Sequence, residues 1–320
     1  MKIAVLDDYQ GVALELADWS EVLRRAQVDV FTDHLADTAA VVKRLLPYDA
    51  VCVMRERTPL RRERIEQLPN LKLIASTGPR NASIDLEAAA ARGIKVVHTG
   101  YFGSPTVELT WGLILGSARH LAAEAAALRG GGWQRCIGDD LSGKTLGIIG
   151  LGNLGSKVAG IALAFGMQVV AWSQNLTAEK AAAVGAALVS KEELLRRSDV
   201  VSIHLVLSER SRALIGAAEL SLMKPTARLI NTSRGPIVVE AALIAALSAG
   251  QIAGAAIDVY DEEPLPPNHP YRNLRNLLAT PHIGYVSRGL YERFYRDSVT
   301  NIRAWLDAQP QDDAQGNPRV

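Results

Sequence analysis

The sequence contains few cysteines and carries almost no excess charge. Its 320 residues include two cysteines, Cys52 and Cys136, and the formal net charge is +1. Two cysteines are too few for a disulfide framework, so we expect free thiols in a reducing cytoplasm and no cysteine-based metal site. A net charge this small gives no reason to expect nucleic acid or an anionic membrane surface as a partner.

Targeting segments and long apolar runs are also missing. Two aspartates fall within the first eight residues, so we expect no secretory signal peptide. The most apolar stretch, residues 107–129, is interrupted by Glu108, Arg119 and His120, so we expect no membrane-spanning helix. Hydrophobic residues still make up 48% of the chain, which indicates a soluble globular protein of about two domains.

Short apolar runs alternate with amphipathic stretches twice along the chain. In the first hundred residues they predict strands at 2–6, 28–32, 50–54, 71–77 and 94–98, with helices at 11–25, 36–46, 61–67 and 85–92. Further on they predict strands at 145–150, 167–172, 200–205, 227–231, 252–258 and 277–280, with helices at 155–165, 191–197 and 238–249. Alternating strands and helices form parallel sheets, so we predict an α/β fold of two doubly wound parallel-sheet domains.

Two longer helices are predicted outside this alternation, at 106–131 and 288–308. The first has a broad apolar surface and could pack between the domains or against another subunit. The second could return to the first domain, which would then contain both ends of the chain. The polar residues 309–320 are expected to fray.

A glycine-rich turn in the second half points to a dinucleotide. The segment TLGIIGLGNLG places Gly150, Gly152 and Gly155 between a predicted strand and a predicted helix. Gly150 permits a tight turn, Gly152 lets the backbone approach a pyrophosphate, and Gly155 lets the helix pack against the strand. The helix N-terminus would offer free N–H groups to the phosphates. A turn whose glycines serve packing alone, or a site for FAD or another nucleotide, are the alternatives.

The residue that should choose between NAD and NADP is Ser173, which lies 18 residues past Gly155. An acidic residue at this point commonly accepts hydrogen bonds from the adenosine ribose and repels a 2′-phosphate. Ser173, followed by Gln174, does neither strongly, so NADP is permitted. No arginine falls within 173–179 and Lys180 is the first cation, which favours NAD slightly.

Residues that suit the reduction of a 2-oxo acid stand at the ends of later strands. Arg234, Glu263 and His282 each follow a predicted strand, and Asp258 closes one of them. Open α/β sheets bind ligands at the carboxyl ends of their strands. An arginine can bind a carboxylate through two parallel hydrogen bonds. A histidine can transfer a proton to or from the substrate, and a carboxylate can fix the tautomer of that histidine. Taken singly, each could instead be a surface or structural residue.

The order GLGNLG, TSRG, DVYDEEP and PHIG resembles the D-isomer-specific 2-hydroxyacid dehydrogenase family, and the resemblance spans nearly the whole chain. It implies a flavodoxin-like substrate domain, residues 1–100 plus 286–320, with an inserted Rossmann dinucleotide-binding domain, residues 101–285. We expect no C-terminal regulatory domain. Family members commonly dimerise through the Rossmann domain and the long helix before it, so a homodimer is expected.

The resemblance also implies roles for individual residues. Arg234 would bind the substrate, His282 would be the general acid or base, and Glu263 would be the partner of His282. Cofactor contacts would come from Gly150, Gly152, Asn153, Leu154, Gly155, Ser173, Gln174, Thr232, Asp258 and Gly284. Of these, Asp258 would contact the nicotinamide amide.

The loop that cradles the substrate carboxylate departs from the family pattern. It is glycine-rich in the family, whereas this chain has TGPRN at 77–81. Pro79 removes a backbone donor and Arg80 adds a cation. Substrate contacts from Arg55, Gly78 and Arg80 would favour a more anionic substrate. Alternatively, the arginines face solvent or pair with a neighbouring glutamate.

The sequence therefore predicts an NAD(P)-dependent oxidoreductase that interconverts a 2-oxo acid and a D-2-hydroxy acid. We expect NAD as the cofactor, with NADP permitted, and no metal. One alternative is a non-enzymatic NAD(H)-sensing partner protein on the same scaffold, although a pure binder has no need of the arginine, glutamate and histidine. Another alternative is a formate dehydrogenase, a relative that usually carries an added N-terminal segment.

Overall fold

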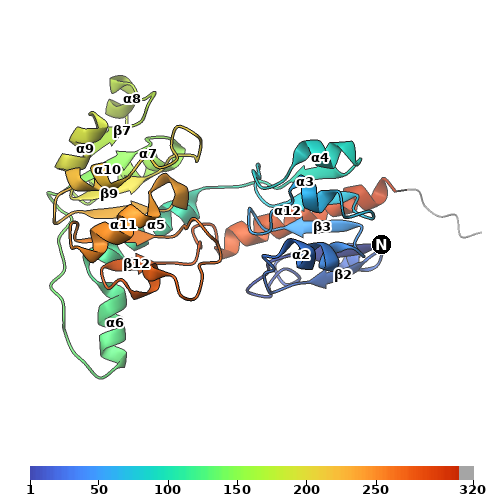
Figure 1. Ribbon diagram of the computed structural model, residues 1–320. Helices are drawn as coiled ribbons and strands as arrows, with labels where there is room; N and C mark the ends of the chain where they lie inside the picture. The colour runs from blue at the N-terminus through green and yellow to red at the C-terminus, as the bar shows by residue number, and fades with distance from the viewer. Residues whose placement is uncertain (310–320) are drawn as a thin grey trace, which may run out of the picture. The chain divides into compact units, whose positions relative to one another are not determined.

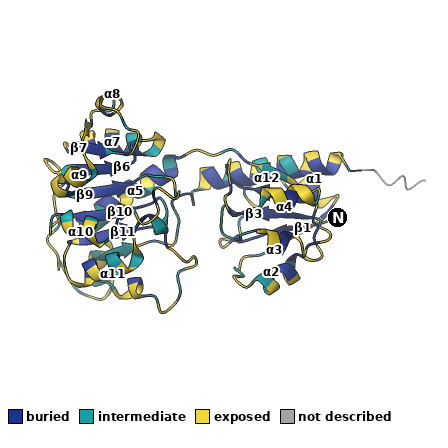
Figure 2. Ribbon diagram, turned by 45° about the horizontal axis from the view of Figure 1, so that its top comes forward, coloured by how far each residue is buried: buried dark blue, intermediate teal, exposed yellow. Residues whose placement is uncertain are grey.

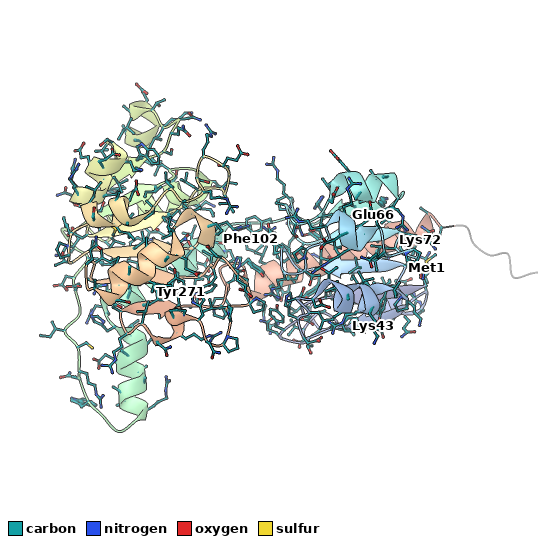
Figure 3. All side chains as sticks on the ribbon, in the orientation of Figure 1. Met1, Lys43, Glu66, Lys72, Phe102 and Tyr271 are labelled. Atoms are coloured by element: carbon teal, nitrogen blue, oxygen red, sulfur yellow. The ribbon has the colours of Figure 1, made fainter. Side chains whose placement is uncertain are left out.

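The computed structural model describes residues 1–309, which form two compact units (Figure 1). Unit 1 comprises residues 1–102 and, within the described part of the chain, residues 288–309, while unit 2 comprises residues 103–287. Phe102, labelled in Figure 3, is the last residue before the chain enters unit 2. The polar end that we expect to fray lies, from residue 310 onward, outside the described residues.

Unit 1 is built on a five-stranded parallel sheet with the strand order β2-β1-β3-β4-β5. Its strands are β1 (Lys2–Val5), β2 (Gln27–Val30), β3 (Ala50–Val53), β4 (Leu73–Ser76) and β5 (Lys95–His98). Its helices are α1 (Ser20–Leu23), α2 (Thr38–Leu45), α3 (Arg62–Ile65), α4 (Leu86–Ala91) and α12 (Arg288–Asp307). Every residue of β3 and β4 is buried, as expected for central strands covered by helices on both faces.

Unit 2 is built on a seven-stranded parallel sheet with the order β12-β11-β10-β9-β6-β7-β8. Its strands are β6 (Thr145–Ile149), β7 (Gln168–Trp172), β8 (Ala187–Leu188), β9 (Val200–Ile203), β10 (Arg228–Asn231), β11 (Gly254–Ile257) and β12 (Leu277–Ala279). Its α-helices are α5 (Ser104–Ala118), α6 (Leu121–Arg129), α7 (Asn153–Ala164), α8 (Ala178–Ala182), α9 (Lys191–Arg197), α10 (Ala217–Leu222) and α11 (Glu240–Ser248). Two short 3₁₀ helices, η1 (Gly235–Ile237) and η2 (Pro270–Asn273), follow later strands.

Both faces of the sheet in unit 2 are covered. Along β10, Leu229 packs with residues of α9, α10 and α11, whereas its neighbour Ile230 packs with residues of α5 and α7. Successive side chains of a strand point to opposite faces, so these helices form two layers with the sheet between them. Figure 2 shows the central strands as buried. The predicted α/β fold with two parallel-sheet domains is confirmed.

The single long helix predicted at 106–131 is wrong, because the structure divides it into α5 and α6. The break includes His120, whose backbone is left-handed with a φ of 52°. A left-handed residue turns the chain out of a right-handed helix, and the continuous apolar composition of this segment hides the break. α6 contains no buried residue, and most of its apolar side chains are exposed.

The helix predicted at 11–25 is also largely wrong, since only Ser20–Leu23 is helical. The backbone N–H of Ala13 donates to the Asp8 carboxylate at 2.8 Å, and the Trp19 indole donates to the Ala13 carbonyl at 2.8 Å. These side-chain bonds hold turns that replace the regular helical ladder. The short elements α8, α10 and β8 were not predicted. Among residues 1–309 no helix combines the length and the apolar character that crossing a membrane requires.

Candidate active site

The glycine turn brings β6 and α7 into close contact. Gly150 has a φ of 102°, and a Cβ atom there would lie 2.7 Å from the carbonyl oxygen of His204. A Cβ atom on Gly155 would lie 2.2 Å from the carbonyl oxygen of Gly150, so a side chain at either position would push the turn apart. Gly152, by contrast, has no atom within 4 Å of its Cβ position. The backbone at Gly152 is therefore open to a ligand, and α7 begins at the next residue, Asn153.

Ser173 lies beside this turn. The backbone N–H of Gly150 donates to the carbonyl of Trp172, the last residue of β7, at 2.8 Å. Ser173 is partly buried and Gln174 is exposed. The side chain of Thr177 caps α8, which contains Lys180. The end of β7 and Ser173 therefore lie next to the glycine turn.

Parallel pairing places three chemically active segments at one edge of the sheet in unit 2. Asn231 at the end of β10 is in register with Ile257 at the end of β11, which is in register with Ala279 at the end of β12. The segments that follow these strands, residues 232–235, 258–264 and 280–284, therefore lie next to one another. They contain the arginine, carboxylates and histidine that we expect to be functional.

His282 and Glu263 meet directly at this edge. Nδ1 of His282 lies 2.5 Å from Oε2 of Glu263, and the backbone N–H of Tyr260 donates to Oε1 of the same carboxylate at 2.9 Å. The side chains of His282 and Glu263 are 23% and 34% exposed, so the pair is accessible to a substrate. When Nδ1–H is donated to the carboxylate, Nε2 is available to exchange a proton. The ring of Tyr285 packs edge-on against the imidazole, with centroids 5.3 Å apart.

Asp258 holds the turn that carries His282. It is 1% exposed, and its carboxylate accepts hydrogen bonds from the Thr280 hydroxyl at 2.6 Å and from the backbone N–H groups of Ile283 and Gly284 at 2.8 and 2.7 Å. Burial raises the pKa of Asp258, and the Thr280 hydrogen bond opposes that rise. The carboxylate that we expect at the nicotinamide amide thus also secures the backbone around His282, whose own φ is 52°.

Arg234 lies in a turn fixed by its neighbours. Its guanidinium donates to the carbonyl of Ser233 at 2.7 Å, and the side chain of Asn231 donates to the carbonyl of Arg234 at 3.0 Å. A Cβ atom on Gly235 would lie 2.1 Å from the carbonyl carbon of Tyr260, so the backbone after Arg234 packs against the segment that carries Glu263. Arg234 is partly buried.

Two threonines of α5 join this site, and the sequence did not single them out. The hydroxyl of Thr106 donates to the carbonyl of Gly284 at 2.9 Å, and the hydroxyl of Thr110 lies 2.8 Å from that of Thr232. Thr232, predicted to contact the cofactor, is therefore held through its side chain, which leaves its backbone for other contacts. The signal that could have revealed Thr106 and Thr110 is their spacing of one helical turn in a mostly apolar helix.

In unit 1, Arg55 and Gly78 lie against each other at the ends of β3 and β4. Both backbones are left-handed, with φ values of 52° and 82°. The backbone N–H of Arg55 donates to the Thr77 hydroxyl at 2.8 Å, and a Cβ atom on Gly78 would lie 1.8 Å from the Arg55 guanidinium. The side chain of Asn81 donates to the carbonyl of Arg55 at 2.6 Å. The absence of a side chain on Gly78 therefore leaves room for the Arg55 guanidinium. The nearby Arg80 side chain is exposed.

Arg57, two residues further on, has a structural environment. Its guanidinium donates to the carbonyl of Asp7 at 2.6 Å and to the Tyr291 hydroxyl at 3.1 Å, and it lies over the ring of Tyr9 at 4.3 Å. These contacts tie β1 and α12 to the loop after β3. Arg57 is therefore engaged within unit 1. Arg55 is engaged as well, since its guanidinium donates to the Thr77 carbonyl at 3.3 Å and lies 3.7 Å from the Glu56 carboxylate, whereas the Arg80 side chain is exposed.

Known proteins resemble this chain along most of its length. Residues 111–284 match the family model described as D-isomer specific 2-hydroxyacid dehydrogenase, NAD binding domain. A glyoxylate reductase of Aeropyrum pernix is 42% identical over 255 residues, which are 77% of this chain and 76% of the relative. A D-3-phosphoglycerate dehydrogenase of Methanocaldococcus jannaschii is 40% identical over 238 residues, which are 73% of this chain but 45% of that longer protein. A solved phosphoglycerate oxidoreductase of Vibrio cholerae has a TM-score of 0.92 at 36% identity, covering 97% of this chain and 100% of that one.

Proposed function

Because this chain belongs to the D-isomer specific 2-hydroxyacid dehydrogenase family, we propose that it interconverts a small 2-oxo acid and the corresponding D-2-hydroxy acid by hydride transfer. Membership confirms the predicted enzyme class, an NAD-dependent 2-hydroxyacid dehydrogenase, and the predicted cofactor, NAD. The observation that carries the finer proposal is the His282–Glu263 contact of 2.5 Å at the carboxyl edge of the sheet in unit 2.

NAD fits the glycine turn, because the backbone at Gly152 is open and α7 starts beside it. We assign the pyrophosphate to Gly150, Gly152, Asn153, Leu154 and Gly155, the adenosine ribose to Ser173 and Gln174, and the nicotinamide end to Thr232, Asp258 and Gly284. When bound, the nicotinamide supplies or accepts the hydride. The absence of a carboxylate at Ser173 also permits NADP, which lacks an arginine partner between residues 173 and 179.

The protein groups supply the proton and the charge stabilisation. In reduction, Nε2 of His282 gives its proton to the carbonyl oxygen of the substrate, and Glu263 stabilises the imidazolium until then. The Arg234 guanidinium binds the substrate and stabilises the negative charge that develops on that oxygen. In oxidation the same groups act in reverse, with His282 as the base.

We assign the substrate carboxylate to Arg55 and the backbone of Gly78, which lie together in unit 1. Arg80 adds a second exposed cation in the same loop. One relative is named a glyoxylate reductase, so glyoxylate heads the candidate substrates, followed by hydroxypyruvate and its 3-phosphate. The second cation would favour the phosphate over the unphosphorylated acid.

We also propose a homodimer that forms through α6 and the segment after it. Leu121, Leu128, Trp133 and Ile137 are 56%, 60%, 74% and 95% exposed, which is unusual for apolar side chains so close together in the chain. Sedimentation velocity would measure the assembly state, and a monomer at all concentrations would contradict the dimer. The cytoplasmic location remains a prediction, in line with the two free cysteines.

The test of the proposed function is a substrate panel assayed with both NADH and NADPH. Glyoxylate, pyruvate, hydroxypyruvate and hydroxypyruvate 3-phosphate would each be supplied while cofactor oxidation is followed at 340 nm, a wavelength set by the reduced nicotinamide. We expect turnover with at least one of these acids and a D-configured product. If NADH binds but none of the acids supports turnover, the proposal fails.

A further inference from the structure

We propose that Tyr260 is a positioning residue that fixes both members of the His282–Glu263 pair, an inference that rests on the proposed function. Tyr260 follows β11 and is 7% exposed. It acts through the backbone and through the carboxylate of Glu263.

The first contact is with Glu263. The backbone N–H of Tyr260 donates to Oε1 of Glu263 at 2.9 Å, while Oε2 of the same carboxylate meets His282. A carboxylate held at both oxygens has one orientation, so the backbone of Tyr260 determines which oxygen faces the imidazole.

The second contact is with the turn that carries His282. The Tyr260 hydroxyl donates to the carbonyl oxygen of Thr280 at 2.7 Å, and the backbone N–H of His282 donates to the same oxygen at 3.0 Å. The phenol therefore anchors the carbonyl on which the left-handed His282 closes its turn. Burial raises the pKa of Tyr260, so its hydroxyl stays protonated and remains a donor at any pH at which the enzyme works.

The third contact is with the segment of Arg234. Gly235 approaches the backbone of Tyr260 and Asp261 so closely that a Cβ atom there would lie 2.1 Å from the Tyr260 carbonyl carbon and 2.6 Å from the Asp261 nitrogen. Tyr260 thus touches all of the segments that carry Arg234, Glu263 and His282. Only the phenol contact can be removed by a side-chain change, so it provides the test.

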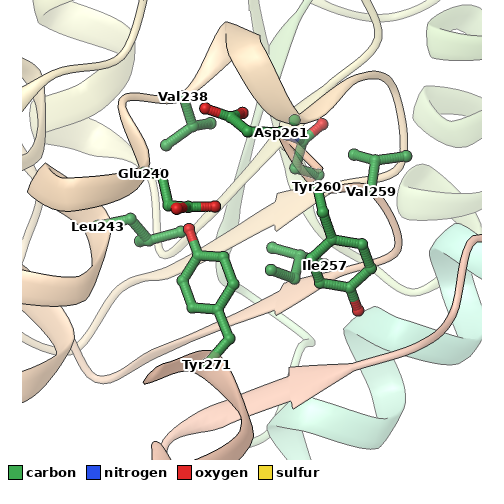
Figure 4. A pocket seen from close by; sticks show the side chains of 10 residues that line it. Val238, Glu240, Leu243, Ile257, Val259, Tyr260, Asp261 and Tyr271 are labelled. Atoms are coloured by element: carbon green, nitrogen blue, oxygen red, sulfur yellow. The ribbon is translucent and has the colours of Figure 1, made fainter. Parts of the chain in front are cut away.

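A second tyrosine beside Tyr260 provides a matched control. The rings of Tyr260 and Tyr271 are 6.3 Å apart and tilted by 53°, and both are buried. Figure 4 shows the Tyr271 hydroxyl directed toward Glu240 in a small pocket, whereas the Tyr260 hydroxyl points away from that carboxylate. Removing either hydroxyl costs the same atoms from the same cluster, but only the Tyr260 hydroxyl reaches Thr280.

The experiment compares Tyr260→Phe with Tyr271→Phe, using a 2-oxo acid accepted by the wild type. In Tyr260→Phe we expect kcat for reduction to fall roughly tenfold, the effect of one lost hydrogen bond that aligns a proton donor. We also expect the fall of kcat at alkaline pH to begin at lower pH. The turn of His282, no longer anchored at the Thr280 carbonyl, holds the imidazole less firmly against Glu263, and the carboxylate then stabilises the imidazolium less. NADH affinity, measured by fluorescence, should stay unchanged. Tyr271→Phe should match the wild type in all three measurements.

The outcomes separate the inference from a merely structural role. If Tyr260→Phe keeps the wild-type kcat and pH profile, the inference is wrong. It is equally wrong if kcat falls by the same factor in both variants, or if kcat and NADH affinity fall together with no change in the pH profile. A refolding defect in Tyr260→Phe is recognised by its thermal unfolding, and the double variant then decides. Adding Tyr260→Phe to His282→Ala should cause no further loss if Tyr260 acts through His282, and an additive loss overturns the inference.

The same set of variants also tests the proposed function separately. If His282→Ala retains the wild-type activity, the proposed function fails, whatever Tyr260 does. If His282→Ala is inactive while Tyr260→Phe behaves as the wild type, only the positioning role of Tyr260 fails.

Discussion

The polar residues at the carboxyl ends of the two parallel sheets have different surroundings. In unit 1, Asp7 follows β1 and is 1% exposed, and its carboxylate contacts His34 at 2.9 Å and accepts a hydrogen bond from Thr58 at 2.6 Å. Arg57 follows β3 and is engaged by the carbonyl of Asp7 and by Tyr291. These residues satisfy one another inside the unit.

In unit 2 the corresponding edge leaves functional atoms accessible. Glu263 and His282 contact each other, but a quarter to a third of each side chain remains exposed. Their supporting residues, Asp258 and Tyr260, are buried. Asp258 accepts hydrogen bonds from backbone N–H groups, and the Tyr260 hydroxyl donates to a backbone carbonyl. The difference shows that a polar residue at a strand end does not by itself indicate a site. Asp7 and Arg57 differ from Glu263 and His282 in this respect: their polar atoms are occupied by neighbours within the unit, whereas the pair in unit 2 keeps part of each side chain exposed to a ligand.

The largest expected effect lies at the accessible edge. His282→Ala should lower kcat by about 10²- to 10⁴-fold, because it removes the imidazole that delivers the proton, while the free energy of unfolding changes by less than about 1 kcal/mol. Steady-state kinetics and chemical denaturation would measure the two effects. His282→Asn, which suits the left-handed backbone, serves as a control and should be equally inactive. A large loss of stability with little loss of kcat would show that His282 is a structural residue and not the proton donor.

The opposite pattern is expected at the buried edge. Asp7→Ala should lower the free energy of unfolding by about 3 kcal/mol, because it leaves the Thr58 hydroxyl and His34 without their acceptor. Asp7→Asn keeps an acceptor oxygen and tolerates the φ of 56°, so it should cost less. Chemical denaturation measures the loss. Activity that vanishes in Asp7→Ala at unchanged stability would show that Asp7 itself acts on the substrate.

A partly buried strand-end residue in unit 2 should behave like Asp7 rather than like His282. His204 follows β9, its Nε2 lies 2.9 Å from the Ser202 hydroxyl, and burial lowers its pKa from 6.5 to about 4. Between pH 6.5 and about pH 4 the unfolded chain therefore binds a proton at this histidine that the folded chain does not bind. The free energy of unfolding consequently falls as pH falls through this window. The loss should reach about 2 kcal/mol at pH 5 relative to neutral pH. His204→Gln should lose less stability on acidification, and an unchanged pH dependence would contradict this assignment.

The smallest expected effect concerns the choice of cofactor. Ser173→Asp should raise the preference for NADH over NADPH about tenfold, because the new carboxylate accepts hydrogen bonds from the ribose and repels a 2′-phosphate. The ratio of kcat/KM for the two cofactors measures the preference. Ser173→Asn, of similar size but neutral, is the control. Undiminished use of NADPH by Ser173→Asp would place the ribose elsewhere.

The fold could be predicted because its signals are local. Buried strands such as β3 and β10 are short apolar runs, and the glycines at 150, 152 and 155 stand at a spacing that few other structures require. The residues at strand ends followed from the strand assignment. The supporting contacts could not be predicted, because Thr106 and Tyr260 act on segments distant in sequence. The break at His120 also escaped prediction, since nothing in the local composition distinguishes a left-handed histidine from a helical one.

The exposed helix α6 offers a way to observe assembly without a label. It has nine residues and none of them is buried, and an isolated helix of this length is barely stable in water. In a dilute solution of single chains its amide hydrogens should exchange with deuterium almost at once, while those of the central strands remain protected. If a second copy covers α6, the exchange slows in proportion to the fraction associated. The amides of this one helix would then report the association constant directly.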